Sequence, residues 1–243
     1  QYINLLTKFY QKTKKEYFKK KLIQTINFIN KEFKNEENLY GSAYDADSEG
    51  IEGKYYVWSY EELKKLLEGD LALFEKKYDI SNSGNFEGKN ILVELKSELK
   101  EDEQNRIAKI EDKLIQERKK RVKPFFDDKS QTDLNAFILD TLISSSIILE
   151  DNNLKNEAIK TLEILNNKLS NKIYHCYDSS EIDAFLEDYV YYAMLLVTLY
   201  EVNGDERSLE KAITVMKEIW KIFYNKDTQL LQKNKIKDND LFV

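Results

Sequence analysis

The stretch YGSAYDADSEGIEGKYYVW, residues 40–58, differs in composition from the sequence on either side of it. It places Asp45, Asp47 and Glu49 at every second position, among three glycines and five aromatic residues. Glycine allows a backbone to take tight, left-handed turns, and loops held on a rigid scaffold commonly carry binding or catalytic residues. The stretch therefore predicts a loop that carries a site, around which the rest of the chain is arranged, although it names no substrate.

The segments on either side of this loop have helical periodicity. Residues 2–13 and 16–33 each carry apolar side chains on one face, and the short polar turn between them predicts an antiparallel hairpin. After the loop, Ser59 with Glu62 three residues later forms a capping box that predicts the start of a helix. The helices expected after the loop cover residues 59–67, 70–78, 98–121, 133–149, 154–169, 183–202 and 206–223.

The predicted hairpins share an internal repeat. Apolar pairs stand at matching places in three second helices, and further apolar residues follow each pair at helical spacing. The pairs are Leu22-Ile23, Ala158-Ile159 and Ala212-Ile213, followed by Ile26, Leu162 and Met216, and then by Ile29, Leu165 and Ile219. Repeated hairpins with short internal turns and long external links predict an all-α array. Such an array either runs open as a solenoid or closes into an (α/α) barrel.

The composition of the 243 residues narrows the function. Hydrophobic residues make up 42% and charged residues 34%, a globular balance, and the net charge of −6 disfavours nucleic-acid binding. No apolar run approaches membrane length and no signal peptide opens the chain, so we expect a cytoplasmic protein without a membrane partner. The single cysteine, Cys176, excludes an internal disulfide, and the single histidine, His175, excludes a multi-histidine metal site. We expect no cofactor and no metal.

Four segments resemble one protein family. Residues 43–58 match the signature of the YyaL-like proteins, also called spermatogenesis-associated, thioredoxin-domain-containing proteins, almost residue for residue. Residues 84–90, 127–135 and 184–189 resemble three further segments of that family. The chain departs from the family at Leu134, where a tryptophan is usual, and at Ala184, where a glycine is usual. Loss of the indole removes a stacking surface, so the resemblance leaves the activity of this member open.

The resemblance implies a six-hairpin (α/α) toroid, like that of the N-acylglucosamine 2-epimerases and many glycosidases. Residues 1–243 then form a single barrel domain or a fragment of one, with an irregular insertion at about 35–98. The helices predicted here are fewer than a full ring needs, and Gln1 begins inside a helical pattern, so we expect a chain excised from something longer. The family's N-terminal thioredoxin-like domain is expected to be absent from this chain.

The positions of the long links predict where acidic side chains meet. If each preceding helix closes a hairpin, the links 34–58, 122–132 and 171–183 lie at one rim of the array. In glycoside hydrolysis, one of two suitably spaced carboxyl groups acts as the general acid, and the other acts as the nucleophile or as the general base. The predicted catalytic residues are Asp45, Asp47 and Glu49 of the first cluster, Asp127 and Asp128 of the second, and Glu187 and Asp188 of the third.

Aromatic and polar side chains near these clusters are predicted to bind a sugar. Tyr44, Trp58 and Tyr189 would offer flat faces to sugar rings, and Lys129 and Asn135 belong to the segment that resembles the family. The structural alternative is that the acids cap helices and order loops, because an aspartate oxygen accepts hydrogen bonds from backbone N–H groups.

Three other interpretations of these residues are weaker. The opening of the 45–56 stretch imitates an EF-hand calcium loop, but its twelfth position is Tyr56 and lacks the required glutamate, which leaves only a calcium site of another kind open. His175 and Cys176 are adjacent on the chain and are not arranged for nucleophilic attack, so both are interpreted as loop residues. The basic run at 118–123 is interpreted as a solvated helix face.

Two functions therefore compete. The first is a sugar-processing enzyme, with histidine-dependent epimerisation disfavoured because only one histidine is present. The second is a non-catalytic barrel that binds a thioredoxin-like domain or another protein. An enzyme requires a pocket with acids inside it, whereas a binding module would use its acids as caps and expose an apolar patch. Self-association is also expected, through apolar flanks on hairpins 2–33 and 183–223 that include Ile3, Phe9, Phe18, Phe33, Trp220 and Phe223.

Overall fold

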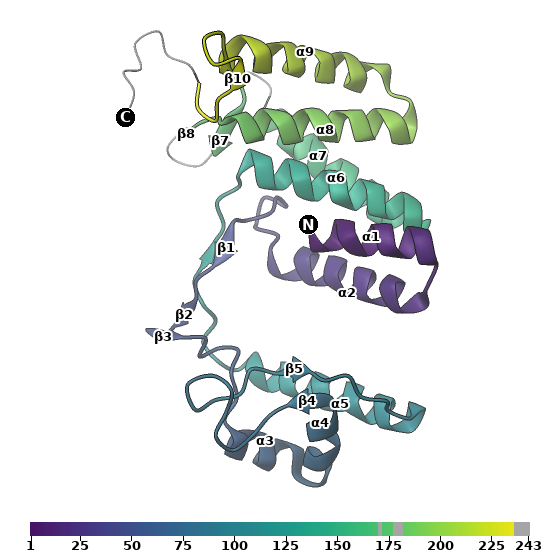
Figure 1. Cartoon of the computed structure of the whole chain (residues 1–243), viewed down its shortest axis with the longest axis vertical. Coiled ribbons are helices and arrows are strands. Elements are labelled where there is room, and N and C mark those ends of the chain that lie inside the picture. Colours follow the sequence, from purple (N-terminus) through teal and green to yellow (C-terminus); the bar gives the residue numbers. More distant parts are fainter. Residues whose placement is uncertain (170–171, 177–181, 236–243) are drawn as a thin grey trace. The chain divides into compact units, whose positions relative to one another are not determined.

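The computed structural model describes residues 1–169, 172–176 and 182–235, and the chain forms two compact units (Figure 1). The first, called here the helical unit, contains Gln1–Ala43 and the chain from Asp127 onward. The second, called the inserted unit, is Tyr44–Phe126. The irregular insertion predicted at 35–98 is therefore a compact unit with different boundaries, and it also includes the long charged helix that the sequence predicts at 98–121.

The described residues of the helical unit form three helical hairpins, as the sequence predicts. They are α1 (Tyr2–Thr13) with α2 (Glu16–Glu32), α6 (Thr132–Leu149) with α7 (Asn152–Lys168), and α8 (Leu186–Asn203) with α9 (Glu206–Phe223). Each hairpin turns on a residue with left-handed backbone: Lys14 at φ 53°, Glu150 at φ 57° and Gly204 at φ 70°. Glycine adopts this conformation without a steric penalty, whereas the lysine and the glutamate each carry a cost of about 1–2 kcal/mol.

Helix α6 lies at the centre of the helical unit. It packs against α1, α7 and α8, and α8 packs in turn against α9 (Figure 1). Because these neighbours lie on several sides, α6 and α8 are apolar around most of their circumference, whereas α9 has a single apolar face. Leu22, Leu139, Ile143 and Leu195 are fully buried in this core. Burial of a side chain of this kind stabilises the fold by about 1.5–3 kcal/mol.

The apolar character of α6 needs a separate explanation. Its 18 residues, Thr132–Leu149, have a mean hydropathy of 1.3, which by length and composition would allow the helix to cross a membrane. Half of that window is buried inside the helical unit. A helix enclosed by α1, α7 and α8 has the same composition, so its packing accounts for the apolar run.

Short two-stranded sheets accompany the helices. Strand β7 (Tyr174–Cys176) pairs with β8 (Ile182–Asp183), and β9 (Tyr224–Asn225) pairs with β10 (Leu230–Leu231). Strands β1 (Ala43–Tyr44) and β6 (Phe126–Asp127) form a further two-stranded sheet. These pairs fix the loops that follow or precede helices, rather than forming a layer of their own.

The inserted unit has its own core. Its elements are β2 (Asp47–Ser48), β3 (Ile51–Glu52), α3 (Tyr60–Leu67), a 3₁₀ turn (Glu68–Asp70), α4 (Leu71–Lys77), β4 (Tyr78–Asp79), β5 (Val93–Glu94) and α5 (Glu101–Arg118). Trp58, Leu63 and Phe74 are buried against the apolar stripe of α5 that includes Ile110. The predicted cap at Ser59 is confirmed, because its hydroxyl accepts from the backbone N–H of Glu62 at 3.2 Å.

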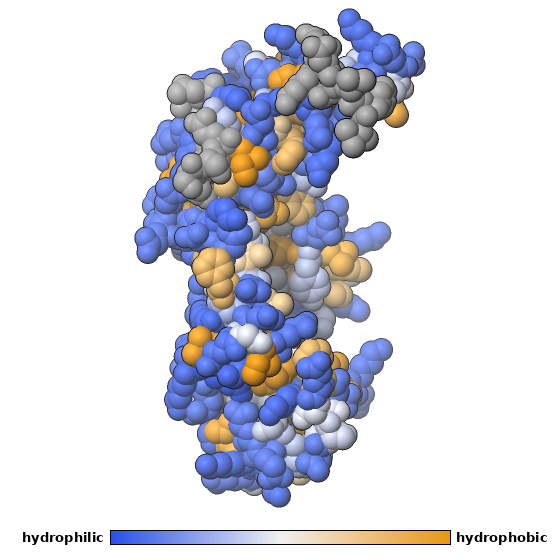
Figure 2. Space-filling view, turned by 90° about the vertical axis from the view of Figure 1, so that its left-hand side faces the viewer, coloured by the Kyte–Doolittle hydropathy of each residue, from blue (hydrophilic) through white to orange (hydrophobic). Residues whose placement is uncertain are grey.

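The predicted apolar flanks of the terminal hairpins are confirmed for two of their six residues. Phe9 and Trp220 are exposed, at 45% and 54%, whereas Ile3 and Phe223 are buried in the core. Phe18 and Phe33 are partly buried against that core. Figure 2 shows that apolar side chains on the face turned to the viewer form separate patches on a largely hydrophilic surface.

A half-buried carboxyl group on α6 makes the stability of the helical unit depend on pH. Asp140 accepts a hydrogen bond from the hydroxyl of Thr198 on α8. Burial raises the pKa of Asp140 above 3.8, the Thr198 hydroxyl acts in the opposite direction, and the charge of Glu201 adds to the increase. The folded state therefore holds this proton more tightly than the unfolded state, and stability falls as pH rises from 3.8 through the folded pKa.

We expect Asp140→Asn to remove this pH dependence. The amide oxygen can still accept from Thr198, but no charge has to be buried. The free energy of unfolding of the variant should therefore exceed that of the wild type at neutral pH, and the difference should vanish in acid. Urea unfolding across the acidic range measures both slopes, with exposed Asp128→Asn as the matched control. Equal slopes for Asp140→Asn and the wild type would contradict the assignment.

Candidate functional site

Three loop regions meet at one end of the helical unit. The side-chain amide of Asn35, after α2, donates to the backbone carbonyl of Asp128 and to the Ser130 hydroxyl, both at 2.9 Å. The backbone N–H of Asp133, in the first turn of α6, donates to Asp188 of α8 at 3.0 Å. The links before α6 and α8 therefore lie at one rim, as hairpin parity predicts for the Asp127 and Asp188 clusters. The Asp45 cluster belongs to the inserted unit, so its convergence with the other two remains a prediction.

Asn135, predicted to bind substrate, uses its amide to hold two backbone segments together. Its side chain is fully buried and accepts from the backbone N–H of Tyr40 at 2.8 Å. Its NH₂ group donates to the carbonyl oxygens of Tyr40 and Gln131, both at 2.9 Å. A buried amide with all of these bonds made is a structural clamp between α6 and the segment after α2, and the structure gives it no surface to offer a ligand.

The carboxylate of Asp188 collects hydrogen bonds from three elements. Its oxygens accept from the backbone N–H of Phe185 at 2.8 Å, from that of Asp133 at 3.0 Å, and from Nδ1 of His175 at 3.0 Å. The side chain is completely buried. Burial raises the pKa of Asp188 above its ordinary value, and the hydrogen bonds from Phe185 and His175 act in the opposite direction. This acid therefore joins the starts of α6 and α8 to β7.

The single histidine has a defined orientation, contrary to its interpretation as an unassigned loop residue. Nδ1 of His175 faces Asp188, and Nε2 lies 3.1 Å from the side-chain nitrogen of Gln131. An ionised carboxylate can only accept, so Nδ1 donates to Asp188. The imidazole is thus held between a carboxylate and an amide.

The same cluster has the donor types of a metal site. Ligand atoms of Asp133, His175 and Asp188 all lie within 4.8 Å of one another in the described part of the chain. Both oxygens of Asp188 already accept from N–H donors, however, and Nδ1 of His175 is one of those donors. A cation would have to displace this hydrogen bond, so the geometry fits a positioning role better than metal binding.

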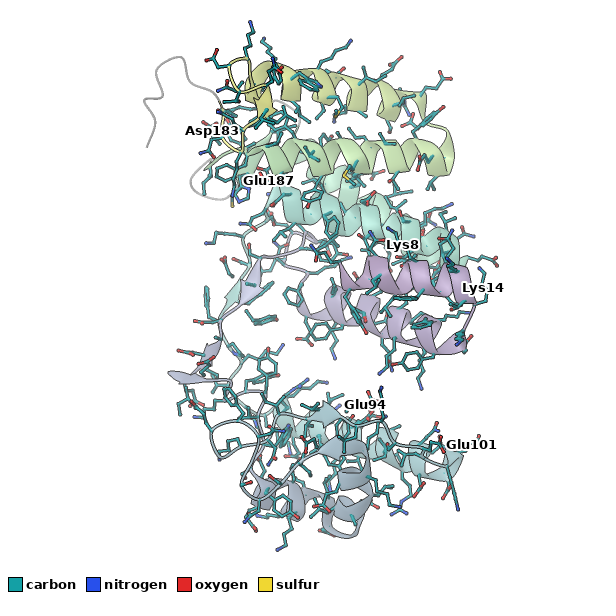
Figure 3. The ribbon with its side chains drawn as sticks, viewed as in Figure 1. Lys8, Lys14, Glu94, Glu101, Asp183 and Glu187 are labelled. Carbon is teal, nitrogen blue, oxygen red and sulfur yellow. The ribbon has the colours of Figure 1, made fainter. Side chains whose placement is uncertain are left out.

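The other predicted acids of the rim are Asp127, Asp128 and Glu187, and their surroundings differ from one another. Asp127 pairs with Lys129 at 3.1 Å, and Asp128 is exposed. Glu187, in the first turn of α8 (Figure 3), is half-buried, and its buried carboxylate oxygen Oε2 has no hydrogen-bond partner among the residues that the structure describes. Tyr189, predicted to contact a sugar, is buried in the core with its ring 5.3 Å from that of Phe223.

The inserted unit contains a cavity of about 550 Å³ that two of the resembling segments line together. Residues 48–59 contribute the turn between β2 and β3 and the chain that follows it, and residues 86–89 contribute the glycine-rich loop after β4. Residues 120–122, after α5, complete the wall. The left-handed glycines Gly50, Gly53 and Gly88, with φ near 70°, allow both loops to turn tightly.

Arg121 holds the wall of this cavity together. Its guanidinium donates to the carbonyl oxygens of Tyr55 at 3.0 Å and Val57 at 2.8 Å, and it pairs with Glu62 at 2.8 Å. The same group stacks 4.0 Å from the ring centroid of Trp58. The interpretation of the 118–123 run as a solvated helix face is therefore wrong for Arg121. No sequence signal separates this arginine from the lysines beside it.

The predicted site residues of the central stretch divide into two groups. Glu49 lines the cavity and pairs with Lys54 at 2.7 Å, whereas Asp45 and Asp47 are exposed and do not line it. The carboxylate of Asp45 accepts from the backbone N–H of Asp47 at 3.3 Å, which is the loop-ordering role described above as the structural alternative. Tyr44 stacks on Phe126 at 4.8 Å.

Trp58 was also predicted to face a sugar, but its ring is buried in the core of the inserted unit. Cavity residues that were not predicted from the sequence include Glu52, Phe86, Glu87 and Lys89. Three of them lie in the 84–90 segment, whose resemblance was the one signal that could have found them.

We expect Asp188→Asn to destabilise the helical unit by about 2–3 kcal/mol, because the NH₂ group would face donors where the carboxylate now accepts. Asp127→Asn, at a partly exposed ion pair, should cost less than about 1 kcal/mol. Chemical unfolding of both variants measures the difference. Similar losses in the two variants would show that the Asp188 network does not hold the rim together.

The comparisons with known proteins leave the family open. No family model matches the chain. The chain is similar to the uncharacterized protein B0495.5 of Caenorhabditis elegans, with 24% identity over an alignment of 243 residues that covers 82% of this chain and 33% of the worm protein. The chain thus spans about a third of the length of this relative.

Proposed function

We propose that the inserted unit binds a neutral carbohydrate in the cavity between residues 48–59, 86–89 and 120–122. The observation that carries this proposal is that two loop segments more than 25 residues apart in sequence, both rich in glycine, line one cavity of about 550 Å³. This volume lies within the range of about 300–1,000 Å³ found for small-molecule sites. Helix packing alone does not require two such loops to enclose a cavity.

The charges of the lining favour a neutral ligand. Four acids and four bases line the cavity: Glu49, Glu52, Glu62 and Glu87 with Lys54, Lys89, Lys120 and Arg121. A phosphate or a carboxylate would be favoured by an excess of positive charge. A balanced set of donors and acceptors suits the hydroxyl groups of a sugar, each of which both donates and accepts. Apolar side chains such as Phe86 and Val57 suit its C–H faces.

The reaction class that these groups would support is glycoside processing. Glu49 and Glu62 are each held in an ion pair, with Lys54 and with Arg121. Glu52 and Glu87 are the two other carboxylates of the lining, and both are exposed to solvent. We propose Glu52 and Glu87 as the acid and its partner, in place of the predicted catalytic residues Asp45 and Asp47, whose side chains lie outside the cavity lining.

A second function is favoured by the helical unit. Asp188 serves as a buried hydrogen-bond acceptor and Asp127 pairs with a neighbouring lysine, so these acids are used in structural contacts. These are the features expected of a module that binds a protein. In this interpretation the three hairpins are part of the six-hairpin toroid that the resemblance implies, and a thioredoxin-like domain is the proposed partner.

Thermal unfolding with a panel of neutral mono- and oligosaccharides tests the carbohydrate proposal. A ligand of the folded state raises the melting temperature, and the shift grows with the logarithm of the ligand concentration above the Kd. Sugar phosphates should bind more weakly than the neutral sugars, since the lining has no excess positive charge. Glu52→Gln should weaken binding at least about tenfold, because it removes a charged hydrogen-bond acceptor. Glu61→Gln, exposed on α3 and outside the cavity, is the matched control.

Two results would contradict the proposal. The first is a melting temperature that no neutral sugar changes. The second is a sugar-induced shift that Glu52→Gln leaves intact, which would place the ligand elsewhere on the chain.

A further inference from the structure

An apolar groove of about 480 Å³ runs along α8 and α9 in the helical unit. Its walls are Val190, Met194 and Val197 of α8 and Met216 and Trp220 of α9, with Leu231 of β10 at one end. Met194, Met216 and Trp220 remain 45–54% exposed. Methionine and tryptophan at such exposure are typical of surfaces that bind a partner helix.

The groove also has an acidic character. Asp140 of α6 lines it, and Glu201 of α8 lies close enough to influence that carboxyl group. Helix α8 carries three acids and no basic residue, and the α8–α9 hairpin over residues 186–223 has seven acids against four bases. A helix that fits this groove should therefore combine large apolar side chains with positive charge.

Helix α1 of the same chain has these properties on its exposed face. Tyr2, Leu5 and Phe9 stand at positions i, i+3 and i+7, and they are 57%, 51% and 45% exposed. Such spacing is how an amphipathic helix anchors itself in a groove. Lys8 and Lys12 flank the stripe (Figure 3 labels Lys8), and residues 1–34 carry nine lysines against two glutamates.

We propose that the groove of α8 and α9 binds the Tyr2–Leu5–Phe9 stripe of α1 from a second copy of this chain. The two surfaces are different patches of one molecule, so the contact is head-to-tail rather than two-fold symmetric. Opposite charge on the two hairpins guides the encounter and excludes the contact of two grooves or of two stripes. The occupant is thus identified by complementary shape and charge within one sequence.

A pair of variants, each blocked at one surface, tests this contact in the full chain. Leu5→Gln with Phe9→Gln removes the apolar anchors of the stripe without adding charge, and Met194→Lys with Met216→Lys places positive charge in the groove. All four side chains are exposed, so the core is not altered. Ile213→Lys, on α9 at similar exposure but outside the groove lining, is the matched control. Circular dichroism and thermal unfolding confirm that each variant is folded.

Sedimentation velocity over a wide concentration range supplies the readout. The wild type and Ile213→Lys should associate with rising concentration, and salt should weaken the association because it screens the charges. Each blocked double variant alone should associate at least about tenfold more weakly. A mixture of the two should form a 1:1 dimer and no larger species, since one copy keeps its groove and the other keeps its stripe.

Three results would overturn the proposal. They are a wild type that stays monomeric at every concentration, a blocked variant that associates as the wild type does, and a mixture that stays monomeric. The first would assign the groove to a different partner, and the other two would place the contact between copies elsewhere. Sugar binding in the inserted unit does not enter this experiment, so the two proposals fail independently.

Discussion

The buried carboxylate of Asp188 is the interaction on which the rim of the helical unit depends. Backbone N–H groups at the starts of α6 and α8 and the ring of His175 all donate to it. A buried carboxylate is costly unless such donors surround it, and the three elements must therefore stay together. Asn135 does the same for the segment after α2, with a neutral amide in place of a charge. Together these two side chains fix every link between the hairpins that the structure describes at this rim.

Because the helical unit uses these polar side chains in structural contacts, we expect ligand-binding side chains in the inserted unit instead. Acids that complete a hydrogen-bond network have no lone pair or proton to offer a substrate, however suggestive their spacing is. In the inserted unit the turn at Glu49 and the loop at Phe86 enclose a cavity whose side chains keep polar groups exposed. Arg121 contributes to this arrangement, because its guanidinium donates to the carbonyl oxygens of Tyr55 and Val57 and so holds the wall in place.

Charge is distributed unevenly along the same chain. The net charge of −6 conceals a strongly basic first hairpin beside a large acidic remainder. Such segregation has little effect on the fold, whose core is apolar, but it affects which surfaces attract one another. It gives the groove of α8 and α9 and the stripe of α1 opposite character, while the cavity of the inserted unit stays balanced. The proposed sugar site and the proposed contact between copies rest on these separate features and use different parts of the molecule.

The sequence by itself determined the helices and their pairing. Apolar residues at helical spacing, the cap at Ser59 and the turn at Gly204 are local signals, and local hydrogen bonding and one-sided burial are sufficient to form a hairpin. The boundaries of the inserted unit could not be predicted in this way, because the apolar stripe of α5 does not reveal which surface it packs against. Hairpin parity placed the Asp127 and Asp188 clusters at one rim correctly.

Only the tertiary structure decided what the polar side chains do. Asp188 and Asn135 look like candidate site residues in the sequence, yet donors distant in sequence satisfy both. Arg121 looks like one member of a solvated basic run, yet its guanidinium donates hydrogen bonds to carbonyl oxygens more than 60 residues earlier in the chain. Trp58 looks like a sugar platform, yet the core of the inserted unit encloses it. A polar or aromatic residue has the same local signal whether it faces a ligand or the protein, and its surroundings are fixed by contacts that the local sequence does not contain.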